Sequence, residues 1–307
     1  MTLQQMEYIV ALNQYRHFVL AAESCGVTQP TMSAMLQKLE DELGVKIFDR
    51  SNKKIEPTGI GSKIIQQAQV ALNETHRIKE VVTDEIGMLS GPLKIGISPT
   101  IAPYIIPDFI HHFQEANPHV SLQINEMRND VLYSEIQFGN LDMGISTTPP
   151  DDKNLIEIPL YHERFVIYLS EQYKNAETPS FDLMDTSQMW ILREGHCMHN
   201  QNFRFCLGSQ KSNTVYKAGS IDTLIRIVDR NGGFTIIPEM HLPFLSETQR
   251  ANIHDIEGSL PTSRTVSILL KPDYIREKMV NAVANAVKLV IPKEMLDERI
   301  RKFDIRL

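Results

Sequence analysis

The sequence has few cysteines, only three in 307 residues, and no apolar run that approaches the roughly 20 residues needed to cross a bilayer. Three cysteines are too few for the disulfide framework of a small secreted domain, and no basic leader followed by an apolar stretch opens the sequence. We therefore predict a cytoplasmic protein without membrane contact. The formal net charge of -7 argues against a protein that coats nucleic acid nonspecifically.

The first sixty residues show the spacing of short helices. Apolar residues recur at helical intervals in 3–13 and again in 18–25, and Gly26 breaks the pattern. Thr28 can cap a third helix that continues to Leu43. A short helix, a glycine-bearing turn and a longer helix are typical of a helix-turn-helix, in which the start of the second helix enters the major groove of DNA.

Residues 46–54 predict a strand and a basic turn, which suits contact with phosphates beside the groove. The acidic run 40–42 keeps a helical protein-binding module open as the alternative. The segment resembles the winged head of LysR-type transcriptional regulators in Phe18, Ala21-Ala22, Thr28 to Ser33, Lys38-Leu39-Glu40, Leu43-Gly44, Phe48, Arg50 and Thr58 to Gly61. This resemblance implies DNA contacts by Thr28, Gln29, Pro30, Thr31, Ser33, Arg50 and Lys53. Cys25 is interpreted as a buried small hydrophobic residue.

A long proline-free stretch follows the head. Its apolar positions alternate at intervals of four and three, as in a coiled-coil seam: Ile64, Ala68, Ala71, Thr75, Ile78 and Val82. We predict a dimerising linker helix, which would match two heads to two half-sites on DNA; a helix packed only on its own domain is the alternative. The predicted domains are a head at 1–58, with the helix-turn-helix at about 18–37, and a linker at 59–89.

Beyond Ser90-Gly91-Pro92, strand-like and helical runs alternate, which predicts α/β units with a largely parallel sheet. Two such units around a cleft resemble the periplasmic-binding-protein-like (type 2) effector domain of the same family, and residues 231–238 resemble its glycine-to-proline signature. We therefore expect a multidomain α plus α/β protein with an effector domain at 91–307. Its subdomain I is predicted at about 91–162 and 266–307, and its subdomain II at about 163–265.

Cys197 and Cys206 lie nine positions apart in the effector half. A thiol attacks peroxide as the thiolate, so a sensor cysteine needs cations or hydrogen-bond donors nearby, which His196 and Arg264 could supply. In a helix the two Cα atoms would be about 13 Å apart, whereas a disulfide allows at most about 7 Å, so closing it would rebuild the segment. Inert core thiols, a zinc site with His196 and His199, and a thiol peroxidase are the alternatives.

The run Glu194-Gly195-His196-Cys197, with Cys206 nine residues later, resembles the redox signature of peroxide-sensing LysR-type regulators. The resemblance implies that Cys197 is peroxidatic, that Cys206 resolves it, and that Thr100, His196 and Arg264 hold peroxide. Asn129 stands where such regulators usually have a second pocket threonine. The stretch after Cys206 is also one residue shorter than in such regulators.

The sequence thus predicts a transcription activator of the oxidative stress response, controlled by a reversible Cys197–Cys206 disulfide, and not an enzyme. The expected partners are promoter DNA, hydrogen peroxide, RNA polymerase, further copies in a homodimer or homotetramer, and glutaredoxin or thioredoxin as reductant. Neither a metal nor a cofactor is expected. The alternative is a LysR-type regulator whose inter-subdomain cleft binds a small effector.

Overall fold

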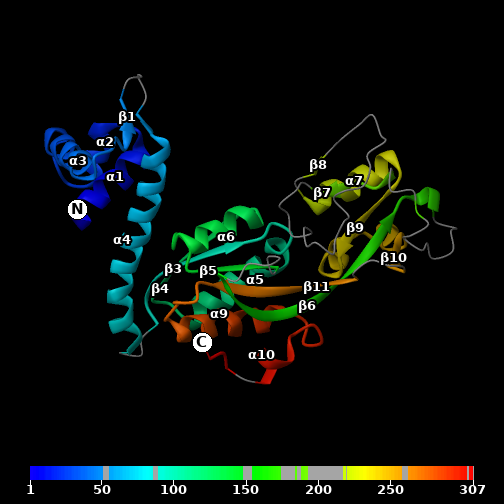
Figure 1. Cartoon of the computed structure of the whole chain (residues 1–307). Coiled ribbons are helices and arrows are strands. Elements are labelled where there is room, and N and C mark those ends of the chain that lie inside the picture. Colours follow the sequence, from blue (N-terminus) through cyan, green and yellow to red (C-terminus); the bar gives the residue numbers. More distant parts are fainter. Residues whose placement is uncertain are drawn as a thin grey trace. The chain divides into compact units, whose positions relative to one another are not determined.

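The computed structural model describes residues 1–50, 55–85, 89–147, 154–173, 184, 188–192, 217–218, 220–257, 262–302 and 304–306. Contacts divide the chain into two units (Figure 1). Unit 1 comprises Met1–Gly87 with Phe138–Asn140, and unit 2 comprises Met88–Gln137 with Leu141–Leu307. None of the described helices is long and apolar enough to pass through a bilayer.

Unit 1 begins with three short helices, α1 (Leu3–Tyr15), α2 (Phe18–Ser24) and α3 (Gln29–Leu43). The antiparallel pair β1 (Phe48–Asp49) and β2 (Glu56–Pro57) follows, and then the long helix α4 (Gly59–Glu85). Thr28 caps α3 as expected, because its Oγ1 accepts a hydrogen bond from the N–H of Thr31 at 3.4 Å. Gly44 ends α3 in the left-handed region, with φ at 67°. The predicted winged helix-turn-helix is confirmed.

The first half of α4 is part of the core of this head. Ile65, Ala68 and Leu72 are buried, and Ile65 and Ala68 belong to the core formed by α1, α2 and α3. Gly61 allows this close packing, since a Cβ atom there would overlap the carbonyl of Ile47. Farther along, Ile78 is 68% exposed. The helix therefore packs on its own head and also carries an uncovered apolar position.

Unit 2 is an α/β structure whose elements follow the predicted alternation. Its first part contains β3 (Gly91–Ile97), α5 (Ala102–Ala116), β4 (Val120–Glu126), α6 (Asn129–Gln137) and β5 (Met143–Thr147). The second contains β6 (Ile156–Leu169), β7 (Ile191–Leu192), β8 (Lys217–Ala218), α7 (Ile221–Asn231), β9 (Phe234–Pro238), α8 (Glu247–Arg250) and β10 (Ile253–Asp255). The chain then returns through β11 (Ser263–Leu270), α9 (Glu277–Val290) and α10 (Glu298–Lys302).

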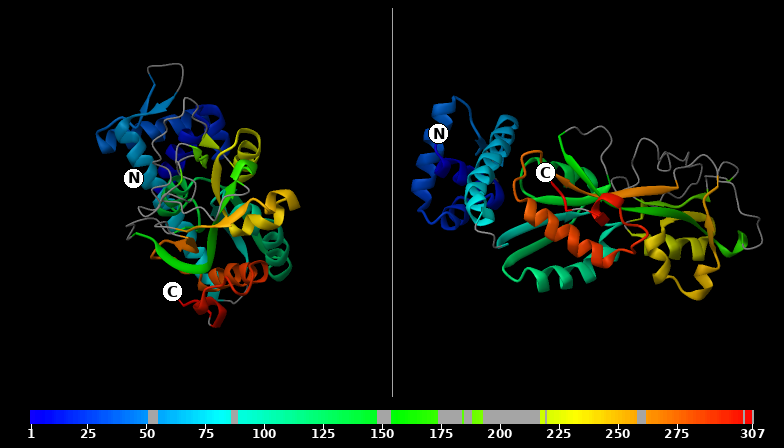
Figure 2. Two further views of the ribbon diagram at one scale, coloured as in Figure 1. Left: turned by 90° about the vertical axis from the view of Figure 1, so that its right-hand side faces the viewer. Right: turned by 90° about the horizontal axis from the view of Figure 1, so that it is seen from below.

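The main sheet has the strand order β10-β6-β11-β5-β3-β4, with β9 also paired to β6. Within it, only β3 pairs in parallel, with β4 and β5, whereas the described pairings of β6 and β11 are antiparallel. The prediction of a largely parallel sheet is therefore wrong. The reason is that β6 runs for 14 residues and serves both halves of the unit. Figure 2 shows β6 and β11 passing from the half with α9 to the half with α7.

Each half of unit 2 has an apolar core among its described residues. In the first, α5 and α9 cover one face of the sheet, and Leu132 and Ile136 of α6 pack on the other face (Figure 1). In the second, α7 and β9 pack with the end of β6, and Tyr104 of α5 joins them. The long strands therefore place residues of both halves side by side, which is where the polar residues of the candidate site lie.

Candidate functional site

The N-terminus of α3 presents polar side chains to solvent. Thr28, Gln29, Pro30 and Thr31 are exposed and Ser33 is half-buried. The hydroxyls of Thr28 and Thr31 lie 2.9 Å apart and form a hydrogen bond, which restricts the rotamers of both side chains. The free N–H groups of a helix start attract phosphate, and the exposed side chains there can reach base edges. This surface has the arrangement that contact with the major groove requires.

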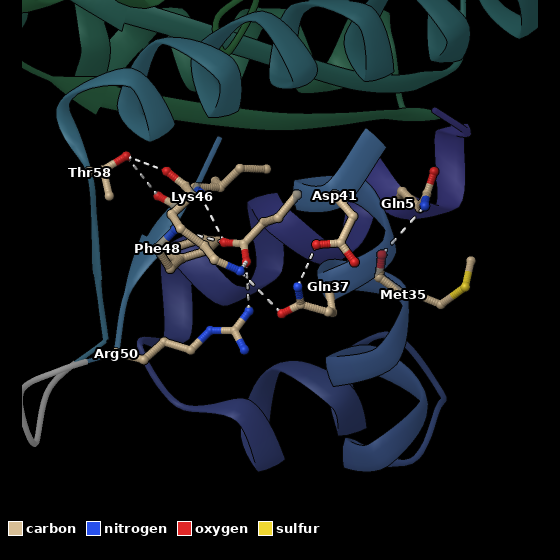
Figure 3. Close-up of polar contacts among 10 residues, drawn as sticks. Gln5, Met35, Gln37, Asp41, Lys46, Phe48, Arg50 and Thr58 are labelled. Atoms are coloured by element: carbon tan, nitrogen blue, oxygen red, sulfur yellow. Dashed lines mark hydrogen bonds and ion pairs between the residues drawn. The ribbon is translucent and has the colours of Figure 1, made fainter. Parts of the chain in front are cut away.

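Glu40 of α3 binds the segment that leads into and through β1, which we call the wing together with β2. Figure 3 shows its partners Lys46, Phe48 and Arg50. Its carboxylate is buried; Oε1 accepts from the backbone N–H of Ile47 at 2.9 Å and of Phe48 at 3.3 Å. Oε2 lies 3.0 Å from Lys46 Nζ and 3.2 Å from Arg50 Nη2. Such charge-assisted bonds are the strong ones. Arg50 is therefore held in a fixed direction, with its guanidinium carbon 5.5 Å from the centre of the Phe18 ring.

The sequence carries a signal for this role of Glu40, although the prediction from sequence did not include it. Glu40 falls on the apolar stripe of α3 with Leu36, Leu39 and Leu43, three and four residues apart. A carboxylate on such a stripe needs a buried partner. Part of the acidic run that suggested a protein-binding module is therefore internal to the fold. Lys53, the other predicted phosphate contact, lies outside the described residues.

In unit 2, Thr100 and Arg264 are in direct contact although they are 164 positions apart in the sequence. Arg264 Nη1 donates to Thr100 Oγ1 and Nη2 donates to the Thr100 carbonyl oxygen, both at 2.9 Å. The guanidinium carbon also lies 5.5 Å from the centre of the Phe165 ring. Both residues are buried. The planar guanidinium of Arg264 thus connects two of the residues that were predicted to form the pocket.

Glu163 is the counterion of Arg264. The two residues are cross-strand partners on β6 and β11, and Arg264 Nε donates to Glu163 Oε2 at 2.6 Å. The Glu163 side chain is fully buried and that of Arg264 is 3% exposed. Burial raises the pKa of the Glu163 carboxyl, and the adjacent guanidinium opposes that rise. Glu163 is absent from the residues predicted from sequence, because only the strand register shows that it faces Arg264.

A second set of polar groups lies at the ends of the parallel strands. Ser98 follows β3, Ser146 lies near the end of β5, and Asn129 begins α6 after β4. Ser98 Oγ, Ser146 Oγ and Asn129 Oδ1 are buried and find no hydrogen-bond partner within the described part of the chain. A buried polar group left unpaired costs about 1–3 kcal/mol. These three unpaired oxygens lie at or near the carboxyl ends of the parallel strands, which is where open α/β sheets bind ligands.

The remaining predicted redox residues, His196, Cys197 and Cys206, lie outside the described residues, as does His199 of the alternative zinc site. Cys25 is half-buried rather than fully buried. It ends α2, packs against the core of the head, and has its Sγ 3.9 Å from Ser24 Oγ. This position is consistent with a packing role for Cys25.

Comparison with protein families places these features in one class. Residues 3–62 match the bacterial regulatory helix-turn-helix protein, lysR family, and residues 87–290 match the LysR substrate binding domain. The chain belongs to the LysR family of DNA-binding transcription regulators, which are not enzymes. The predicted pairing of a helix-turn-helix head with a type 2 periplasmic-binding-protein-like domain is thereby confirmed.

Within the family, the chain is similar to hydrogen peroxide-inducible genes activators and to proteins named OxyR. It is 33% identical to the hydrogen peroxide-inducible genes activator of Haemophilus influenzae, over 95% of this chain and 99% of that protein. It is 30% identical to the DNA-binding transcriptional dual regulator OxyR of Escherichia coli, over 94% and 95%. The structure of a full-length OxyR variant from Pseudomonas aeruginosa superposes with a TM-score of 0.76 at 28% identity, covering 97% and 98% of the two chains.

Proposed function

We propose that this chain is a transcription activator of the oxidative stress response that senses hydrogen peroxide through a reversible Cys197–Cys206 disulfide. The observation that carries this proposal is the buried Thr100–Arg264 contact, because the same two residues are expected to hold peroxide. Full-length similarity to hydrogen peroxide-inducible genes activators supports it.

The proposed chemistry is a two-step oxidation. The Cys197 thiolate attacks one oxygen of peroxide, the O–O bond breaks, and the departing hydroxide takes a proton to become water. The thiolate of Cys206 then attacks the sulfenic sulfur of Cys197, the S–O bond breaks, and a second water leaves. Glutaredoxin or thioredoxin supplies the two electrons that restore the thiols. Thr100, Asn129, His196 and Arg264 are assigned to hold peroxide.

The proposed domain roles follow the predicted boundaries. Residues 1–58 bind promoter DNA through Thr28, Gln29, Pro30, Thr31, Ser33, Arg50 and Lys53, residues 59–89 form a dimer, and residues 91–307 form the regulatory domain. The exposed Ile78 on α4 supports the dimer, because a second helix would cover it. The regulatory domains then join two dimers into a tetramer. RNA polymerase is the proposed partner at the promoter, and the cytoplasm is the proposed location.

The second candidate is a LysR-type regulator that binds a small effector at the strand ends. The unpaired oxygens of Ser98, Asn129 and Ser146 favour it, since they could bind a polar ligand directly. Replacing Cys197 by serine separates the two candidates. The peroxide proposal expects the response of the DNA footprint to stoichiometric peroxide to disappear. An unchanged response in this variant would favour the effector candidate instead.

A further inference from the structure

Helix α5 carries two histidines and a glutamate on its last two turns. The ligand atoms of His111, His112 and Glu115 all lie within 4.8 Å of one another. His111 Nε2 is 3.9 Å from Glu115 Oε2, and the two imidazole centroids are 5.4 Å apart. His112 is half-buried, and the other two side chains are exposed.

The helix geometry explains why these groups converge. Glu115 follows His111 by four residues and His112 by three, so its carboxylate projects between both imidazoles. Zinc bonds to imidazole nitrogen and carboxylate oxygen are about 2.0–2.2 Å long, which puts the ligand atoms of a tetrahedral site about 3.3 Å apart. The ligand atoms are within 4.8 Å of one another, and rotamer changes of the exposed His111 and Glu115 can bring them closer without moving the backbone.

The backbone at this position is fixed, and it favours a cation. Phe109 and Phe113, which belong to the same turns, are fully buried and stacked at 5.4 Å between ring centres. The last turn of α5 has no basic residue, so the negative end of the helix dipole is not compensated by a side chain there. The three groups also have no polar partners in the described part of the chain besides one another.

We propose that His111, His112 and Glu115 bind one divalent transition metal ion, with Zn²⁺ or Ni²⁺ as the class of ligand. Two imidazole nitrogens and one carboxylate suit these ions, whereas Ca²⁺ and Mg²⁺ require oxygen ligands. Three protein ligands leave at least one coordination position for water. The site includes neither Cys197 nor Cys206 and does not depend on the peroxide proposal.

The test is isothermal titration of the full chain with Ni²⁺ after chelator treatment, in a Cys197→Ser/Cys206→Ser background that removes two of the three thiols and leaves only the half-buried Cys25. The parent is expected to bind one equivalent at this site. His112→Ala and Glu115→Ala are each expected to weaken it at least about tenfold, because even an outer-shell partner of a metal ligand contributes about 10- to 100-fold. His119→Ala, a nearby exposed histidine outside the cluster, is the matched control and should bind as the parent does.

Thermal unfolding provides a second readout. One equivalent of Ni²⁺ should raise the Tm of the parent and of His119→Ala but not that of His112→Ala, because binding to the native state alone stabilises it. The metal-free Tm of the exposed variant Glu115→Ala should equal that of the parent. Titrations in which His112→Ala and Glu115→Ala keep the full equivalent, or in which the parent binds none, would overturn the proposal.

Discussion

Removing one member of the Glu163–Arg264 pair should destabilise unit 2 strongly. In Arg264→Met the fully buried carboxyl group of Glu163 loses its counterion. In Glu163→Leu the guanidinium of Arg264, whose side chain is 3% exposed, loses its counterion. Loss of one partner from a buried pair costs about 3–5 kcal/mol, and Arg264→Met also removes both donors to Thr100. For a unit of this size the cost corresponds to a Tm decrease of about 6 to 20 °C.

The double variant Glu163→Leu/Arg264→Met should be more stable than either single variant. It places two apolar side chains across the same strand pair and leaves no buried charge, and such replacements are often neutral. The assay is differential scanning calorimetry of the reduced full chain, with the transitions of the two units followed separately. Arg164→Met is the control, because Arg164 is 63% exposed in its pair with Glu239 and should contribute at most about 1 kcal/mol.

Additive destabilisation in the double variant would refute this reasoning about the pair. So would a single-variant Tm change as small as that of Arg164→Met. Either result would mean that Glu163 and Arg264 do not compensate each other's burial. The parent, the two single variants and the double variant form a double-mutant cycle. The coupling free energy from this cycle decides whether Glu163 and Arg264 compensate each other, and measuring it requires no ligand.

Three other changes have defined outcomes. Glu40→Gln should lower the Tm of the head and weaken DNA binding in a fluorescence anisotropy titration, since Arg50 loses its anchor; unchanged affinity would contradict this. Thr28→Ala should cost about 1 kcal/mol in chemical unfolding, with Thr28→Ser near the parent. His241 forms a hydrogen bond with Tyr104, and burial lowers the pKa of the His241 imidazole, so the native state disfavours protonation of His241. Stability should be full above about pH 6.5 and fall as pH drops toward the lowered value, and His241→Gln should flatten this dependence in Tm measurements.

Local patterns predict the head and the first half of unit 2 well. The boundaries of α3 follow from the cap at Thr28 and the glycine at Gly44, which are local features. The long-range pairing is not predictable in the same way. Only the end of β6, from Phe165, is recognisable as a strand, because Pro159 and the irregular alternation before it obscure the rest. Its register with β11 depends on residues about a hundred positions away.

The candidate site shows the same division. Thr100 and Arg264 are indicated by resemblance, and the fold brings them into contact. Glu163 is not predictable, because an isolated glutamate in a strand carries no sign of its partner. The unpaired oxygens of Ser98 and Ser146 are hidden for a similar reason, since serine in a strand is ordinary until its burial is known.

Peroxide is proposed to join Cys197 to Cys206 in a disulfide. Peptide mass spectrometry after brief treatment with stoichiometric peroxide, with free thiols blocked before digestion, tests it directly. The expected product is a crosslinked peptide that contains both residues, formed without Cys25 and reversed by reductant. Recovery of both peptides with blocked thiols, from protein whose DNA footprint has nonetheless changed, would contradict the claim.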